Sequence, residues 1–280
     1  MTLLNEAECN LRVDHSDCIE DSLLATWQRT AWLLEDFSEV LGDECKVPYR
    51  ETLNPPLWEI GHFNWFYEWF ITRNPQWHLG LESHYDAERT ESRLPHFDKV
   101  LDSSAIAHEP RWNEILPGRR DILEYQDLVH QDVLSCLNQA RQLASEDDSN
   151  PDQVYYFFKL CLMHEQMHNE AAVFMAAQLG IPVRPEAANP RKASWQRSEG
   201  KTFHIPKQTW NLGWTGSGFC FDNEQPAHIV ELNAFEIDAS PVTWRQYIRF
   251  IQATEHPLPS GFQWAETQLK AKQFGHSRTV

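Results

Sequence analysis

The chain has 280 residues, of which 41 % are hydrophobic, and it contains 12 Trp, 15 Phe and 7 Tyr. This length and composition are typical of a folded protein with two ordinary domains and argue against disorder. The formal net charge of -17 disfavours nucleic acid and anionic membranes as partners. The N-terminus lacks the pattern of a signal peptide, and no apolar stretch reaches the roughly 20 residues of a membrane span. We therefore expect a cytoplasmic protein with small-molecule substrates, whose oligomeric state the sequence does not indicate.

The six cysteines lie far apart and include no C-x-x-C pair, which argues against a zinc ribbon and against a disulfide framework. We therefore expect six reduced thiols. Cys161 lies three residues before His164, a helical spacing that could bring its sulfur near a metal. A buried cysteine is more often a small apolar side chain, so Cys161 is not among the predicted ligands.

Four segments in the first 180 residues have the spacing of apolar side chains that is typical of helices. The second segment opens with Pro55 and Pro56, which suit a first helical turn, and the fourth ends at Gly180, which suits a C-terminal cap. Four such helices predict a bundle. The segments cover residues 21–41, 55–73, 120–144 and 151–179. The long connection over residues 74–117 lacks such periodicity, and a loop of this length is usually functional or a crossover.

The composition changes after Gly180, where prolines punctuate a polar linker and short alternating runs follow. These runs predict strands, and a short helix is expected over residues 243–253 with Thr243 as its N-cap. The fold class predicted is α+β. A four-helix bundle covers residues 15–182, a linker covers residues 183–201 and a second domain covers residues 202–280.

His164 and His168 stand four residues apart in the run HEQMHNE. On a helix they differ by roughly 40° in direction and roughly 6 Å in rise, so both imidazoles can bind one ion. The same face carries apolar side chains, which points the pair into the bundle. Those side chains are Phe157, Leu160, Cys161, Met167, Ala171 and Met175. From the spacing alone, a metal site and a structural histidine pair are about equally plausible.

Glu170 is rotated by roughly 200° from His168, which places it badly for joining both histidines on one ion. We expect it in a second shell or near a neighbouring helix. Glu165 also lies off the histidine face, so HEQMH is a weak match to the H-E-x-x-H motif of zinc proteases.

His62 on the second helix is the candidate third ligand, since it shares a stripe with Trp58, Trp65 or Phe66, and Trp69. Bundles build metal sites from inward side chains on facing helices. The alternative is an ordinary core histidine bonded to a carbonyl. Three histidines with open positions fit either zinc, which activates water, or iron, which reacts with oxygen.

Two longer stretches carry a family resemblance. GHFNWFYEWF together with HEQMHNEAAVFMAAQLG resembles the DinB-like domain of the ergothioneine-type sulfoxide synthases. The segment LGWTGSGFCFDNEQPAHIVELNAFEIDASPVTWRQYIRFI resembles the opening of the formylglycine-generating-enzyme-like, or sulfatase-modifying, domain of the same enzymes, which is C-type-lectin-like. Both stretches occur in the family's order, which is more specific than either alone.

The resemblance implies non-haem Fe(II) bound by His62, His164 and His168. Such enzymes use O2 to join a sulfur donor to the imidazole carbon of hercynine, a trimethylated histidine betaine. Met167 and Glu170 are then expected in the second shell. Trp65, Phe66 and Arg111 are pocket candidates, and aromatic residues suit such a cation. The sequence does not identify the catalytic acid, and no tyrosine in this chain can be matched to the family's catalytic one.

The sequence departs from the ergothioneine pattern at Met167, where a glutamine is common, and at VLDSSAIAHEPRW, which replaces an arginine-rich run. The stretch VLDSSAIAHEPRW looks more like that of the family branch that takes a selenosugar and makes selenoneine. The donor is therefore a thiol or a selenosugar. The family continues well past position 280, and the tail from about Pro257 leaves its pattern, which a truncated or frameshifted gene would explain. The rival hypotheses are a zinc-dependent DinB-type thiol transferase and a non-catalytic remnant.

Overall fold

The computed structural model describes residues 11–13, 17–113, 116–188 and 200–258, together with three strands beyond them. The chain divides into two compact units. The first comprises residues 1–177, 181–189 and 216–221, and the second comprises residues 178–180, 190–215 and 222–280. The predicted α+β class, with a helical first domain and a strand-containing second one, is confirmed.

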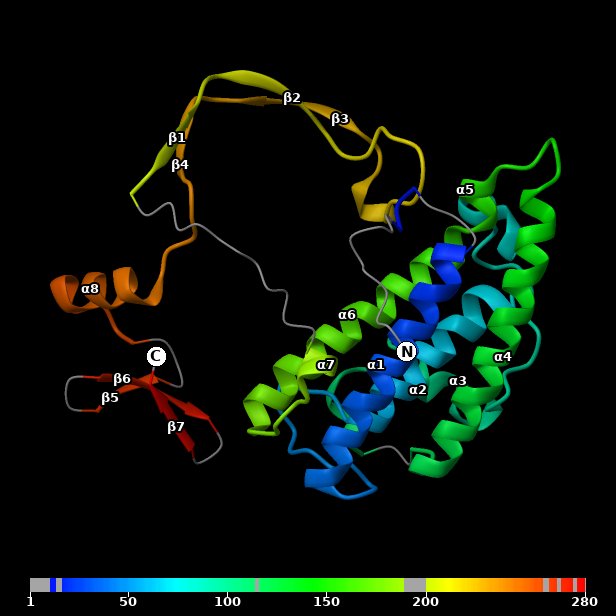
Figure 1. The fold of residues 1–280 in the computed structure, drawn as a ribbon, viewed down its shortest axis with the longest axis horizontal. Helices are drawn as coiled ribbons and strands as arrows, with labels where there is room; N and C mark the ends of the chain where they lie inside the picture. The colour runs from blue at the N-terminus through cyan, green and yellow to red at the C-terminus, as the bar shows by residue number, and fades with distance from the viewer. Residues whose placement is uncertain are drawn as a thin grey trace. The chain divides into compact units, whose positions relative to one another are not determined.

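The first unit is a bundle of four long helices that lie side by side (Figure 1). They are α1 (Asp17–Leu41), α2 (Pro56–Tyr67), α4 (Arg119–Ala144) and α6 (Tyr156–Leu179). All four predicted helices are therefore confirmed. The second helix continues past α2 as the π-helix η1 (Glu68–Thr72), in which the amide of Arg73 donates to the carbonyl of Glu68. It ends just before Asn74 and Pro75, as predicted.

The position of each helix in the bundle follows from its apolar pattern. α4 buries a single stripe at three-to-four spacing and exposes its polar side, as expected for an outer helix. The stripe is Ile122, Tyr125, Val129, Val133, Leu137 and Ala140. α2 is buried nearly all round, which is typical of a central helix. Its few polar side chains are thereby confined to the interior, where they need partners.

The connection between α2 and α4 is not irregular. It forms the short helices η2 (Trp77–Glu82), η3 (Pro95–Phe97), α3 (Asp98–Leu101) and η4 (Glu109–Trp112). α3 packs closely on α2 at Gly61, where an added Cβ would lie 2.6 Å from a methyl carbon of Leu101. A side chain at position 61 would therefore push α3 away from α2.

Residues 183–188, expected to be part of a linker, pack against the bundle instead. They include α7 (Pro185–Ala188), and the guanidinium of Arg29 donates to the carbonyl of Ala187 at 2.7 Å. Arg184 forms an ion pair with Asp36 at 2.7 Å. A further helix, α5 (Pro151–Val154), precedes α6. The rest of the predicted linker up to residue 199 lies outside the described residues.

The second unit contains two antiparallel strand pairs. β1 (Thr202–Ile205) pairs with β4 (Phe235–Asp238), and β2 (Gln208–Leu212) pairs with β3 (His228–Leu232). The short helix η5 (Asp222–Glu224) lies between β2 and β3 in the chain. The strands predicted in this region are confirmed.

The second unit also contains α8 (Trp244–Thr254), which begins with a capping box. The hydroxyl of Thr243 accepts from the amide of Gln246, whose side chain in turn accepts from the amide of Thr243. Thr243 is thus the N-cap, as predicted. A three-stranded antiparallel sheet follows, in the order β5 (Phe262–Ala265), β6 (Gln268–Gln273) and β7 (His276–Thr279).

Two further predictions can be compared with the described residues. Cys45, Cys136, Cys161 and Cys220 carry free thiols. Cys18 is disulfide-bonded, so the prediction of six reduced thiols is wrong there. Cys9 lies outside the described residues. Over the part of the chain that the structure describes, no helix has both the length and the apolar character needed to cross a membrane.

Candidate metal centre

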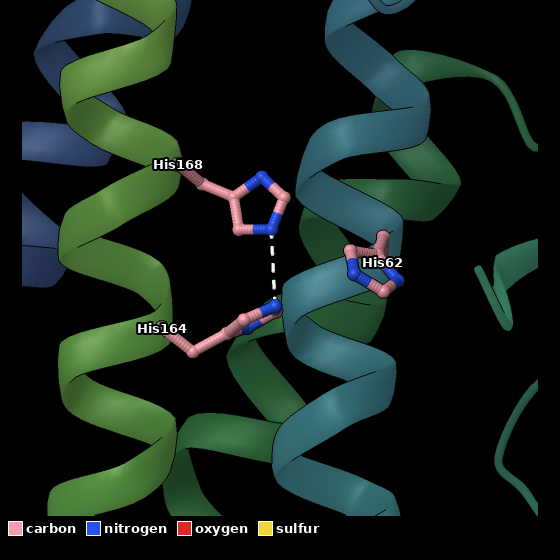
Figure 2. Close-up of side chains that lie close together, drawn as sticks. All are labelled: His62, His164 and His168. Atoms are coloured by element: carbon pink, nitrogen blue, oxygen red, sulfur yellow. Dashed lines mark hydrogen bonds between the residues drawn. The ribbon is translucent and has the colours of Figure 1, made fainter. Parts of the chain in front are cut away.

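The bundle brings His62 of α2 together with His164 and His168 of α6 (Figure 2). One ring nitrogen of each histidine lies within 4.8 Å of the others. The Nε2 atoms of His164 and His168 are 3.1 Å apart. Two nitrogens that share an ion at bonds of about 2.1 Å are about 3.0 to 3.4 Å apart, depending on the bond angle. The predicted pair therefore already has the spacing of two ligands on one metal.

The orientation of His62 is fixed by the end of α3. The last carbonyls of a helix have no partner inside it. Two of these carbonyls accept side-chain hydrogen bonds from α2: that of Val100 from the indole of Trp58, at 2.7 Å, and that of Leu101 from Nδ1 of His62, also at 2.7 Å. A carbonyl can only accept, so Nδ1 of His62 carries the proton and Nε2 presents its lone pair to the cluster.

The orientation of His168 is fixed by Glu59, whose carboxylate accepts a hydrogen bond from Nδ1 of His168. Nε2 of His168 therefore presents its lone pair toward His164, the arrangement found in carboxylate–histidine–metal sites. Glu59 is buried. Burial alone would raise the pKa of this carboxyl, but the hydrogen bond from His168 and the nearby imidazoles lower it overall. Glu59 is therefore a carboxylate.

Electrostatics also favour neutral imidazoles at His62 and His164. Burial, followed by the proximity of His168, lowers the pKa of His62 to about 4. Burial and the two neighbouring imidazoles lower the pKa of His164 to about 2. Metal ligands must be deprotonated, so these side chains are ready to bind an ion at neutral pH. The buried Nδ1 of His164 has no hydrogen-bond partner among the described residues.

Aromatic rings enclose the histidines. Phe66 stacks on His164 at a centroid distance of 3.9 Å, and Trp58 stacks on His62 at 4.7 Å. The ring of Trp65 is nearly parallel to that of His62, at a centroid distance of 6.3 Å. Arg111 lies one layer further out, with its guanidinium 3.9 Å from the centre of the Trp58 ring. Of the three predicted pocket residues, Phe66 stacks on a histidine and Trp65 lies near one, whereas Arg111 lies over Trp58.

The structure corrects the expected second shell. Glu170 is exposed on α6, and Met167 is 51 % exposed, so neither belongs to the buried wall around the histidines. Glu59 fills the role expected of Glu170. The sequence contains a signal for it, since Glu59 is a lone carboxylate three residues before His62 in an otherwise apolar helix. No residue type in the sequence marks the Leu101 carbonyl as the hydrogen-bond partner of His62, because every residue has a carbonyl.

Glu165 and Cys161, the two other residues considered as possible participants in the site, both lie outside the histidine cluster. Glu165 turns away from the histidines and accepts a hydrogen bond of 2.5 Å from the hydroxyl of Thr30 on α1. The thiol of Cys161 lies 3.8 Å from the carbonyl of Phe66, and burial raises its pKa well above the usual range. The candidate ligand group among the described residues consists of the three histidines, whose ring nitrogens lie within 4.8 Å of one another, and it does not include Cys161.

Two family models match the chain. Residues 22–172, more than half of the chain, match the DinB superfamily. Residues 188–278 match the sulfatase-modifying factor enzyme 1-like domain. The chain is 24 % identical to the hercynine oxygenase of Mycolicibacterium smegmatis over 266 residues, which cover 92 % of this chain and 57 % of that protein.

Two other relatives match over smaller parts of their own lengths. Ergothioneine biosynthesis protein 1 of Neurospora crassa is 24 % identical over 256 residues, which cover 82 % of this chain and 26 % of that protein. A formylglycine-generating enzyme of Streptomyces coelicolor is 33 % identical over 79 residues, 28 % of this chain and 25 % of that protein. The chain thus belongs to the DinB superfamily, carries a sulfatase-modifying-factor-like second domain, and is related to the ergothioneine-type synthases that its motifs resemble.

Proposed function

We propose that this chain is part of a non-haem Fe(II), O2-dependent synthase that joins a sulfur or selenium donor to the imidazole carbon of hercynine. The observation that carries the proposal is the cluster of His62, His164 and His168, oriented by Leu101 and Glu59. Similarity to a hercynine oxygenase over 92 % of this chain supports the choice of reaction. The chain spans 57 % of that relative, so the activity is proposed for the protein as a whole.

Iron suits the proposed reaction better than zinc, because the similar protein of Mycolicibacterium smegmatis is named an oxygenase. An oxygenase needs a metal that reacts with O2, and zinc has no redox chemistry. Three neutral imidazoles leave coordination positions open for O2 and substrate, and bound iron would supply the redox chemistry there. The donor is a thiol such as γ-glutamylcysteine or cysteine, or a selenosugar.

The chain's own residues would orient and shield the metal. Glu59 and Leu101 hold the rings of His168 and His62 in place, so little reorganisation is needed when the metal binds. Phe66 and Trp58 each cover one face of a histidine ring. A trimethylammonium group is attracted to aromatic faces, so a wall of this kind suits hercynine.

The test is metal analysis of protein purified without oxygen, followed by O2 uptake with hercynine and each donor in turn. We expect bound iron and hercynine-dependent uptake, with a new C–S or C–Se bond detected by mass spectrometry. His62→Ala should lose both the metal and the uptake. His204→Ala, which changes an exposed histidine on β1, is the matched control and should lose neither.

The other outcomes separate the rival functions. Bound zinc without O2 uptake would indicate a thiol transferase, in which the metal activates a thiolate. Bound iron that never consumes O2 with any donor would indicate a metal-binding remnant. Folded protein that binds neither metal would refute the site itself.

A further inference from the structure

A row of nearly parallel rings runs along one face of the second helix and includes a proposed metal ligand. Trp58, His62, Trp65 and Trp69 follow the i, i+4, i+7, i+11 spacing of a helical stripe. Trp58 and His62 are 4.7 Å apart and inclined by 9°. The next two steps, to Trp65 and then to Trp69, are 6.3 Å at 16° and 5.4 Å at 21°. We call Trp65, Trp69 and the next ring, Tyr85, the outer row.

The outer row leads from the buried site to the surface. Trp65 is buried, Trp69 is partly buried, and Tyr85 is 73 % exposed. The rings of Trp69 and Tyr85 lie 6.5 Å apart. The row therefore runs from the imidazole of His62 to solvent in steps of 6.3, 5.4 and 6.5 Å between ring centroids.

A second aromatic row leaves the site in another direction but differs in chemistry. Phe66 stacks on His164, Phe70 lies 4.5 Å from Phe66, and Phe157 lies 5.3 Å from Phe70. Phenylalanine rings are far harder to oxidise than indole or phenol rings. Both rows fill the core, but only the outer row consists of side chains that can lose an electron.

The surroundings of the outer row favour passage of charge toward Tyr85. The indole N–H of Trp65 donates to the carboxylate of Asp98 at 2.6 Å, and the same carboxylate forms an ion pair with Arg73 at 2.7 Å. An oxidised Trp65 therefore has in contact a carboxylate that it shares with Arg73. The guanidinium groups of Arg73 and Arg89 lie 5.3 Å and 5.2 Å from the ring centre of Trp69. These cations disfavour a positive charge on Trp69. An electron vacancy is therefore less stable on Trp69 than on its neighbours, and at Tyr85, which is 73 % exposed, loss of the phenol proton to water holds it at the surface.

We propose that Trp65, Trp69 and Tyr85 form an electron relay that reduces an over-oxidised metal centre when O2 has reacted without substrate. This inference rests on the proposed function for its oxidant. One electron passes inward from Tyr85 through Trp69 and Trp65 to the metal. The phenol of Tyr85 releases its proton to water and becomes a neutral radical. An external thiol restores it by donating a hydrogen atom, and two of the resulting thiyl radicals couple to a disulfide.

The decisive experiment needs no metal at the histidines. A ruthenium bipyridyl photo-oxidant is attached to a cysteine introduced by Met167→Cys, in a Cys136→Ser background that removes a partly exposed thiol. After a laser flash with an external quencher, transient absorption and electron paramagnetic resonance report which side chain is oxidised. We expect a tyrosyl radical that is lost in Tyr85→Phe and is slow or lost in Trp69→Phe.

Tyr49→Phe is the matched control, because Tyr49 is also exposed, at 47 %, and packs on Trp112 at 5.1 Å outside the row. It should leave the radical unchanged. A signal that survives in Tyr85→Phe, or no radical in a labelled protein with native circular dichroism, overturns the relay whatever metal the site binds.

A second measurement connects the relay to the metal. Iron-loaded protein is exposed to O2 without hercynine, and oxidised residues are mapped by peptide mass spectrometry. We expect oxidation at Tyr85 in the unmodified protein and a shift to side chains around the histidines in Trp65→Phe. An unchanged pattern in Trp65→Phe would show that the row does not serve the metal. Failure to retain iron would refute the proposed function, while the flash experiment still decides the relay.

Discussion

The helical bundle and the strand-rich unit use their apolar side chains in opposite ways. In the bundle, apolar stripes of outer helices such as α4 meet the central helices, and side chains such as Leu137 and Phe158 are completely buried. In the second unit, Ile229 on β3 is 74 % exposed and Phe203 on β1 is 58 % exposed. A strand pair buries its apolar side chains only when another layer covers one face.

The same contrast explains where the site lies. A site that orients ring nitrogens needs side chains held by packing and by buried hydrogen bonds, which the bundle supplies at His62 through Leu101 and at His168 through Glu59. The described part of the second unit contributes none of the three candidate ligands. Metal binding is therefore expected to depend on the bundle's residues, and four measurements test or sharpen this comparison.

The largest effect is expected from removing a ligand. His164→Ala leaves two histidines and should abolish detectable metal binding, measured by metal analysis after gel filtration. His204→Ala in the second unit should keep full metal content. Circular dichroism shows whether both variants fold. Retention of metal by folded His164→Ala would mean that the ion binds elsewhere.

The next effect concerns stability and compares the two regions directly. Leu137→Ala removes a fully buried side chain from α4 and should lower the free energy of unfolding by about 2–5 kcal/mol, because it loses apolar burial and leaves a cavity. Ile229→Ala removes an exposed side chain from β3 and should change the free energy of unfolding by no more than about 0.5 kcal/mol. Urea unfolding followed by tryptophan fluorescence measures both. Equal losses would show that β3 is covered in solution.

Removing the charge of Glu59 should have an intermediate effect. Glu59→Gln weakens the hydrogen bond that orients His168, and loss of such a partner typically reduces metal affinity by about 10–100-fold. Competition with a chelator measures the change. Glu170→Gln is the matched control on exposed α6 surface and should leave the affinity unchanged. If Glu170→Gln lowered the metal affinity more than Glu59→Gln, then Glu170 rather than Glu59 would be the carboxylate that supports the ligands.

The smallest effect is expected at the cap of α8. Thr243→Ala removes the hydroxyl that accepts from the amide of Gln246 and should destabilise the helix by about 1 kcal/mol. Thr243→Ser keeps the hydroxyl and should behave like the unmodified protein. Hydrogen exchange of the amides in the first turn of α8 reports the change locally. Identical exchange in the two variants would mean that the capping box does not stabilise α8.

Much of the bundle was predictable because its signals are local. Apolar spacing, the prolines before α2 and Gly180 after α6 set the helices without reference to the rest of the chain. The i, i+4 spacing of His164 and His168 is of the same kind. In the second unit, Thr243 likewise predicted where α8 begins, because an N-cap residue is a local signal.

Other features depended on contacts between segments far apart in the sequence. Spacing alone left open whether His62 is a ligand or a core histidine, and the fold decided that it faces the α6 pair. Glu59 rather than Glu170 contacts His168 because α2 and α6 pack face to face, a relation that helical periodicity in one segment cannot reveal.

The sequence by itself determined the helices, the histidine pair and the two-domain family. Only the tertiary structure decided which carbonyl and which carboxylate orient the ligands. The Leu101 carbonyl reaches His62 because α3 ends against α2 at Gly61, and every residue has a carbonyl, so no residue type marks this contact. Backbone partners of this kind follow from how helices approach one another, which the chain fixes only when it folds.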